Sequence, residues 1–193
     1  SRIVAEGTRE EPVVMSSIRP RYQGPNQWGG LIIQGRAGHS ACDGDTACNA
    51  ASMSLGYSGG KDEFDDSGVL SHVVITGAGQ SRGYWDDALG QHIDVFSNGL
   101  TLLSVGQGTL IDTVQVDETS HGGASVHLSG GSVNAKRLVL THQGSTMLSL
   151  DSGYSGNLQH VFVNQRDWSY LGSAIRISSD ELDSRKTMPT LAN

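Results

Sequence analysis

The sequence has little cysteine, proline and aromatic content, and it lacks a long apolar run. Its 193 residues include 2 cysteines, 4 prolines and 6% aromatic side chains. No segment reaches the roughly 18–20 consecutive apolar residues that a membrane-spanning helix needs, so we expect no membrane span in this chain. No secretory signal pattern is present either, and we expect Ser1 to be the end of a processed or trimmed chain.

Positive charge is also scarce. The chain has 13 Lys and Arg against 20 Asp and Glu, which gives a net charge of −7. A nucleic-acid-binding surface must neutralise a series of phosphates with basic side chains, and an anionic membrane attracts the same kind of surface. We therefore expect neither partner. The acidity is compatible with an extracellular protein and with divalent cations.

Glycine, by contrast, is abundant, with 26 residues in the chain. Glycine adopts positive φ without steric cost, so a sequence rich in Gly, Ser, Thr and Val is typical of short strands joined by tight turns. The length corresponds to one domain that spans residues 1–193.

One pattern occurs three times between Asn98 and Gln165. Each copy has a short alternating strand, a Gly/Ser turn and a longer alternating strand, and the period of about 22 to 26 residues is that of a solenoid. Strict alternation predicts that one set of side chains points inward. This set is Leu100/Leu102, Val126/Leu128, Leu148/Leu150 and Ile175/Ile177 in the short strands, and Val73/Ile75, Val114/Val116, Leu138/Leu140 and Val161/Val163 in the longer ones.

Two sets of residues should point outward. Those between the inward positions of the short strands are Thr101, His127, Ser149 and Arg176. Those that directly precede the first inward residue of the longer strands are His72, Thr113, Arg137 and His160. Asn134 and Asn157 start the longer strand in two copies, which predicts a two-step asparagine ladder with hydrogen bonds between the stacked amides.

These patterns predict an all-β fold, a right-handed parallel β-helix with long loop excursions. A β-sandwich or jelly roll would also contain many short strands, but it would not require equivalent positions to recur at a near-constant period. The repeat is interrupted at residues 36–66, 80–90 and 166–171. We expect specific binding at these interruptions and a scaffold role for the repeat.

The first interruption, residues 36–66, contains both cysteines. Cys42 and Cys48 lie close together in a loop rich in Gly, Asp and Ser, which predicts a local disulfide and an oxidising compartment; two free thiols are the alternative. The same loop holds five acidic side chains whose oxygens could bind calcium, although the full twelve-residue calcium-loop pattern is absent. They are Asp43, Asp45, Asp62, Asp65 and Asp66. The alternative is that they keep the loop soluble and cap strand starts.

Aromatic and acidic residues lie together in the other two interruptions. Flat rings beside carboxylates suit sugar stacking and hydroxyl bonding, so we predict a glycan site formed by Tyr84, Trp85, Asp86, Asp87, Trp168 and Tyr170. The alternative is that each Trp folds back over a small core under its loop. No catalytic signature is present. The sequence shows no nucleophile elbow, and it predicts no cleft in which two carboxylates, or a carboxylate and a basic residue, converge.

Several segments resemble those of secreted or cell-surface right-handed parallel β-helix proteins of the hypothetical-lipoprotein type found in Bacteroidetes and marine bacteria. They include Trp28-Gly-Gly-Leu-Ile-Ile-Gln-Gly, Asp65-Asp-Ser-Gly-Val-Leu-Ser-His-Val-Val-Ile, and Gly130-Gly-Ser-Val-Asn-Ala-Lys-Arg-Leu-Val. The resemblance covers nearly the whole chain. It implies a β-helix outside the cytoplasm and no particular reaction. It also implies further strands before and after this chain, and hence that the chain is an excerpt of a larger protein.

We therefore expect a secreted, periplasmic or cell-surface β-helix module for adhesion, glycan binding or extracellular structure. Its partners would be glycans or other surface components, and its open ends could pair with another copy or with a segment of the parent protein. No cofactor is required, and calcium could bind. The alternative function is a polysaccharide lyase or hydrolase that acts in a groove beside residues 80–90.

Overall fold

All of the regular secondary structure assigned in the described residues is strand. The computed structural model describes residues 2–18, 24–42, 58–80, 82–86, 90–95, 97–120, 122–142, 145–165, 172–179 and 184–193. In these residues the strands are β1 (Ile3–Glu6), β2 (Val13–Met15), β3 (Leu31–Gln34), β4 (Gly68–Thr76), β5 (Arg82–Asp86), β6 (Gln91–Val95), β7 (Leu100–Leu103), β8 (Leu110–Asp117), β9 (Val126–Ser129), β10 (Asn134–Thr141), β11 (Leu148–Asp151), β12 (Asn157–Asn164), β13 (Ile175–Ile177) and β14 (Thr190–Ala192). No helix in this described part is long and apolar enough to cross a membrane.

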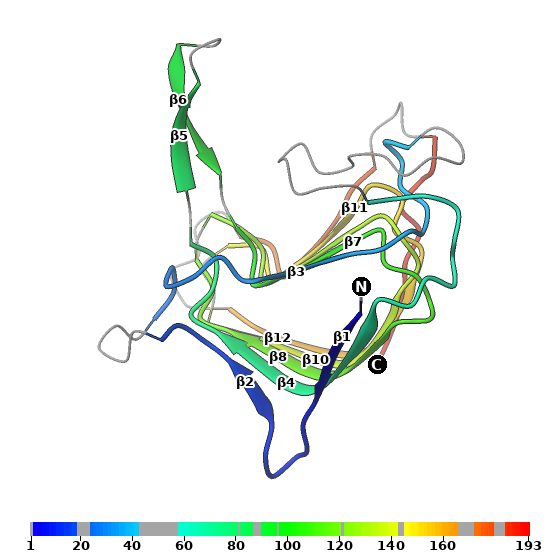
Figure 1. Cartoon of the computed structure of the whole chain (residues 1–193), viewed down its shortest axis with the longest axis horizontal. Coiled ribbons are helices and arrows are strands. Elements are labelled where there is room, and N and C mark those ends of the chain that lie inside the picture. The colour runs from blue at the N-terminus through cyan, green and yellow to red at the C-terminus, as the bar shows by residue number, and fades with distance from the viewer. Residues whose placement is uncertain are drawn as a thin grey trace.

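The strands stack into two parallel sheets that face each other (Figure 1). One sheet has the order β1-β4-β8-β10-β12-β14, with β2 paired to β4, and the other has the order β13-β11-β9-β7-β3. Every pairing within these two sheets is parallel. The fold is the predicted right-handed parallel β-helix. The sandwich alternative is wrong, because it requires antiparallel sheets.

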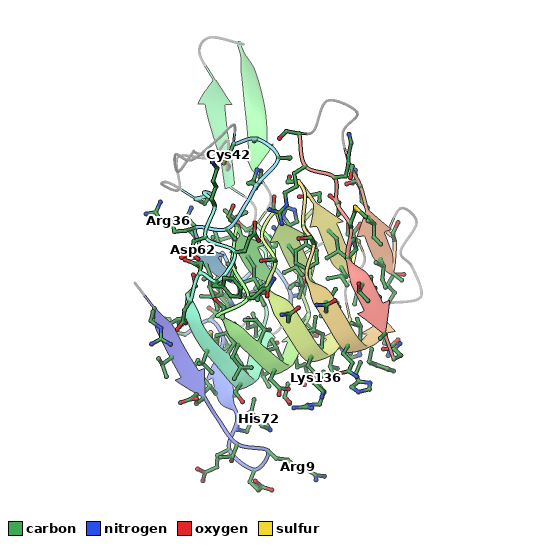
Figure 2. All side chains as sticks on the ribbon, turned by 90° about the vertical axis from the view of Figure 1, so that its right-hand side faces the viewer. Arg9, Arg36, Cys42, Asp62, His72 and Lys136 are labelled. Atoms are coloured by element: carbon green, nitrogen blue, oxygen red, sulfur yellow. The ribbon has the colours of Figure 1, made fainter. Side chains whose placement is uncertain are left out.

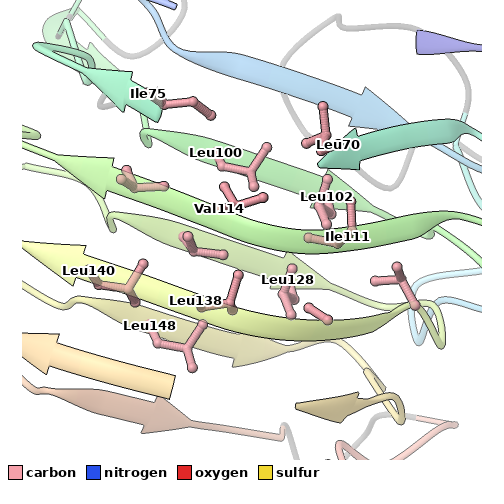
Figure 3. Close-up of a cluster of buried hydrophobic side chains, with 14 of the residues drawn as sticks. Leu70, Ile75, Leu100, Leu102, Ile111, Val114, Leu128, Leu138, Leu140 and Leu148 are labelled. Carbon is pink, nitrogen blue, oxygen red and sulfur yellow. The ribbon is translucent and has the colours of Figure 1, made fainter. Parts of the chain in front are cut away.

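The register is the one that the repeat predicts. Leu100 pairs with Val126, Val126 with Leu148, and Leu148 with Ile175. Equivalent inward side chains therefore stack in continuous columns, as the close-up of the core shows (Figure 3). The stack is fully buried at its centre, where Leu102 and Leu128 are each 1% exposed, and it opens at β13, where Ile177 is 51% exposed.

Each long strand bends at one residue, which the sequence did not predict. His72, Thr113, Arg137 and His160 have φ between 51° and 59°, and the ladder between neighbouring strands skips these positions. A non-glycine residue in this left-handed region is uncommon, and a β-branched one such as threonine is a true outlier. The bend divides each long strand into two faces, so each turn of the solenoid has three sides.

The turn formed by β1 and β2 departs from this rule. β1 pairs with the first half of β4, and β2 pairs with the second half. Residues 7–12 therefore occupy the corner that a single residue forms in the later turns, and they project outward as a loop (Figure 1).

Two local predictions have clear outcomes. The asparagine ladder is confirmed: the side-chain amide of Asn157 donates to Oδ1 of Asn134 at 2.7 Å, and the backbone N–H of Asn157 donates to the same oxygen at 3.0 Å. The expected excursion at residues 80–90 is instead an antiparallel hairpin, in which β5 pairs with β6. Gly90, at φ 62°, lies in its turn, and the hairpin projects from the solenoid (Figure 1).

Candidate functional site

A polar groove of about 290 Å³ lies on the outer face of the five-stranded sheet. We call it the sheet groove. Its floor is made by side chains of β9, β11 and β13, and its rim by the loops that lead into β7, β9 and β11. The polar lining residues are His127, Ser149, Asp151 and Arg176 from the strands, and Asn98, Ser145 and Thr146 from the loops.

Strand alternation brings the floor residues together. His127, Ser149 and Arg176 are register partners on three adjacent strands, and all three lie between inward apolar residues, so they point outward. Asp151 follows Ser149 by two residues and shares its face. It is therefore a diagonal neighbour of His127, a placement within reach of a long or aromatic side chain.

His127 and Asp151 form the central contact of the groove. Nε2 of His127 lies 2.7 Å from Oδ2 of Asp151, and both side chains are about one-quarter exposed. Burial by itself would raise the pKa of Asp151. The hydrogen bond from His127, together with the positive charge of the imidazole when it is protonated, outweighs burial and holds the pKa of Asp151 below its usual value.

Asn98 fixes the orientation of this imidazole. Oδ1 of Asn98 accepts a hydrogen bond from the backbone N–H of Ala124 at 2.7 Å, so its amide nitrogen faces the other way. That nitrogen donates to Thr101 Oγ1 at 2.9 Å and lies 3.3 Å from Nδ1 of His127. Nδ1 therefore accepts and Nε2 carries the proton that bonds Asp151. Both ring nitrogens are engaged by protein groups.

Other groups in the groove remain available to a ligand. Arg176 is exposed, and its side chain makes no hydrogen bond or ion pair with any residue that the structure describes. Its guanidinium presents five N–H donors, and the hydroxyl of Ser149 can both donate and accept. A fixed imidazole–carboxylate pair beside free donors matches the hydrogen-bonding pattern of a hydroxyl-rich ligand.

The loop that follows β3 and contains Gly38 and His39 covers another part of the same sheet face. His39 is 5% exposed, and its Nε2 lies 3.2 Å from the hydroxyl of Ser129. The backbone N–H of Gly38 donates to Glu63, which also binds Arg185. Burial would raise the pKa of Glu63, but the hydrogen bond and charge of Arg185 hold it below the usual value. The sheet groove thus lies beside the part of this face that the loop covers.

The structure does not describe the side chains of the predicted glycan residues. Tyr84, Trp85 and Asp86 lie on β5, and the structure describes only their backbone. Asp87, Trp168 and Tyr170 lie outside the described residues. The predicted aromatic platform therefore stays a prediction.

Three of the five predicted calcium ligands are described, and each makes local bonds. Asp62 accepts from the N–H of Phe64 at 3.1 Å, and Asp65 accepts from the hydroxyl of Ser67 at 2.8 Å. Asp66 accepts from the N–H of Gly68 and pairs with Arg2. No metal-binding group of three or more His, Cys, Asp or Glu side chains occurs among the described residues.

The rest of the calcium and disulfide predictions lies outside the described residues. Asp43, Asp45 and Cys48 belong to that part of the chain, whereas Cys42 is described. The calcium site and the Cys42–Cys48 disulfide stay predictions.

Sequence reasoning missed the sheet groove. It assigned the outward positions of the repeat to a scaffold and predicted no carboxylate beside a basic residue in a cleft, yet Asp151 and Arg176 line the same groove. The sequence contained the necessary information. Asp151 lies two residues after Ser149 and therefore points to the same side of the strand, and His127 is aligned with Ser149 in the preceding copy. The groove would have been found by extending the outward column by two residues.

Comparison with known proteins supports the parallel β-helix. A family model described as a pectate-lyase-like β-helix domain matches residues 1–193. The search found no matching curated protein and no matching solved structure. The match agrees with the parallel pairing and with the absence of helices from the described residues.

Proposed function

The chain belongs to the pectate-lyase-like β-helix family, and we propose that it is a non-catalytic module that binds a glycan in the sheet groove. Its solenoid supplies a rigid outer face, and binding sites on rigid elements hold their side chains more closely than sites on loops. We place the module outside the cytoplasm, either secreted or held at the cell surface as a lipoprotein. Its role there would be adhesion or extracellular structure. The predicted disulfide supports that location.

The state of His127 is the observation that carries this proposal. A general base needs a free nitrogen within hydrogen-bond reach of the proton it removes. In this groove Asn98 engages one nitrogen of His127 and Asp151 engages the other. The pair is therefore arranged to hold a fixed pattern of donors and acceptors, which favours binding over turnover.

Arg176 extends this pattern toward the ligand. It is exposed and lies in register with Ser149, and its side chain forms no hydrogen bond or ion pair with the described residues. A guanidinium can bond a pair of sugar hydroxyls or a carboxylate through parallel N–H groups. We expect Arg176 to contribute affinity, and the His127–Asp151 pair to contribute orientation.

A second candidate function is a polysaccharide lyase or hydrolase. The observation that favours it is the presence of Asp151 and Arg176 in the same groove, since acid–base cleavage of a polysaccharide requires ionisable groups that converge on the substrate. Against it, Asp151 is bonded to His127, and the groove offers no second carboxylate among its described lining residues.

The test combines a glycan array with a turnover assay. Each glycan bound on the array is titrated against the wild type and against Arg176→Gln, which should weaken binding by about tenfold because a charge-assisted hydrogen bond is lost. Arg9→Gln is the matched control, since it removes an exposed arginine far from the groove, and it should leave affinity unchanged. The same glycans are incubated with protein, and reducing ends and unsaturated products are measured.

The two functions give different results. Binding without product supports the module. Turnover that is abolished by Asp151→Asn supports the enzyme and overturns the proposal, as would binding that is equally insensitive to Arg176→Gln and Arg9→Gln.

A further inference from the structure

A second concave site lies on the outside of the solenoid where the long strands bend. It is a cleft of about 220 Å³ on the larger sheet, whereas the sheet groove lies on the five-stranded sheet. We call it the bend cleft. The residues that define it are Arg9, Pro12, His72, Val74, Arg137 and Val139.

The cleft exists because one corner is longer in the turn formed by β1 and β2. Residues 7–12 project there as a loop, whereas β4, β8 and β10 turn the same corner with one residue each. The loop forms a wall next to the column of bend residues, and Arg9 lies near its tip. Figure 2 shows Arg9 and His72 along one edge of the molecule, with Lys136 farther along the same edge.

The ionisable residues that line the cleft are all basic. They are Arg9, His72 and Arg137, and no acidic residue is among the described lining residues. Glu10 and Glu11 follow Arg9 in the loop but do not line the cleft. Since the whole chain carries a net charge of −7, an anion would be attracted here only by these local side chains.

Two of these basic groups are held in place. Nε of Arg137 donates to Thr113 Oγ1 at 2.9 Å, and its Nη2 bonds Asp112. Nδ1 of His72 lies 3.1 Å from the hydroxyl of Ser71, which leaves Nε2 for another partner. Both residues have left-handed backbone at the corner, and both line the cleft. The arrangement is therefore formed before any ligand arrives, which lowers the entropic cost of binding.

The floor of the cleft is mostly apolar. Val74 and Val139 point outward from β4 and β10, and each is only partly buried. Gln115 of β8 lies between them in the register and also lines the cleft, so the floor has one polar side chain at its middle. The same outward column continues to Val14, which is 58% exposed, and to Phe162, which is 57% exposed. Apolar side chains thus lie directly beside the basic corner.

We propose that the bend cleft binds a small amphiphilic anion, with an aromatic or short aliphatic body on Val74 and Val139 and a carboxylate, sulfate or phosphate head between Arg9, His72 and Arg137. The head matches the charge of the rim, and the body matches the floor. A volume of about 220 Å³ is below the roughly 300–1,000 Å³ of sites for drug-sized ligands, so the ligand is small. This site is independent of the sheet groove.

The probe is sodium benzoate, titrated into ¹⁵N-labelled protein and followed by amide chemical shifts. We expect saturable shifts near residues 72–74 and 137–139. Benzyl alcohol lacks the charge and acetate lacks the apolar body, so both should bind at least about fivefold more weakly. Arg9→Gln should weaken benzoate binding by about fivefold, since it removes one partly screened ion pair.

Two control variants separate the cleft from general surface charge. Lys136→Gln removes a neighbouring cation outside the cleft, and Arg176→Gln removes a cation of the sheet groove; neither should change benzoate affinity. The proposal is overturned if benzoate gives no saturable shifts up to its solubility limit, if acetate binds equally well, or if all three variants weaken binding alike. Melting curves that match wild type confirm that each variant is folded.

Discussion

Truncating the same core column at its centre and at its open end tests the packing of the solenoid. Leu102, Leu128, Leu150 and Ile177 occupy equivalent register positions on β7, β9, β11 and β13. Leu128 is 1% exposed and has a column neighbour on both sides. Ile177 is 51% exposed and has one neighbour, Leu150, in the described structure. The two variants are Leu128→Ala and Ile177→Ala.

The expected losses differ because only one site leaves a closed cavity. Buried Leu→Ala replacements cost about 2–5 kcal/mol, which includes a cavity term. Leu128 lies between two strands that the ladder holds in place, so the site cannot collapse, and we expect about 3 kcal/mol. Ile177 is already half in water and its truncation leaves an open hollow, so about 1 kcal/mol is expected from lost burial alone.

Urea denaturation followed by far-ultraviolet circular dichroism measures both values by linear extrapolation. Leu150 is a column neighbour of both positions, so the loss in the double variant should differ from the sum of the single losses by a coupling free energy of about 0.5 kcal/mol or more. Equal losses in the two single variants, or a larger loss for Ile177→Ala, would refute the reasoning, because burial along the column would then not determine stability.

Two further predictions concern ionisable groups. The folded-state pKa of Asp151 is below the 3.8 of an unperturbed carboxyl, so its contact with His127 stabilises the fold above pH 3.8, and this stabilisation is lost as the pH falls through the folded-state pKa. In urea titrations at a series of acidic pH values, Asp151→Asn should therefore lose less stability than wild type as the pH falls. The same decrease in the free energy of unfolding for both proteins would contradict this. Tyr154 is fully buried and donates to the carbonyl of Val133 at 2.8 Å, so Tyr154→Phe should cost about 1–3 kcal/mol at neutral pH. Burial raises the pKa of Tyr154 above 10.0, so wild type should lose stability as the pH rises past 10.0, where the unfolded tyrosine ionises; Tyr154→Phe should lose less over that range, and an identical alkaline limb would count against the argument.

The fold could be predicted because it depends on a pattern that every copy repeats. Period-2 alternation and a near-constant spacing determine which side chains stack, and the pairs from Leu100 to Ile175 have the predicted register. The asparagine ladder followed from the same alignment. Each of these features lies within a single copy, so aligning the copies of the repeat with one another is enough to find them.

The bends and the sheet groove depend on information that alternation does not contain. His72, Thr113, Arg137 and His160 share a backbone conformation but no side-chain chemistry, and glycine, the usual sign of positive φ, is absent from these four positions. The groove depends on a diagonal contact between β9 and β11 and on the loop that covers another part of the face. Such contacts require three-dimensional coordinates, although the parity of Asp151 was visible.

The single-residue bend has a consequence for how this scaffold tolerates change. Four consecutive strands turn that corner in the same way, whereas the other two corners carry connections of very different lengths, including the β5–β6 hairpin. From β4 to β12, length variation is therefore confined to the other two corners, where a peptide could be grafted without altering the stacking of neighbouring strands. An insertion at the bend of β8 would disrupt its backbone pairing with both β4 and β10. The one long bend, at residues 7–12, occurs in a turn whose strands β1 and β2 each pair with β4 alone in the described structure.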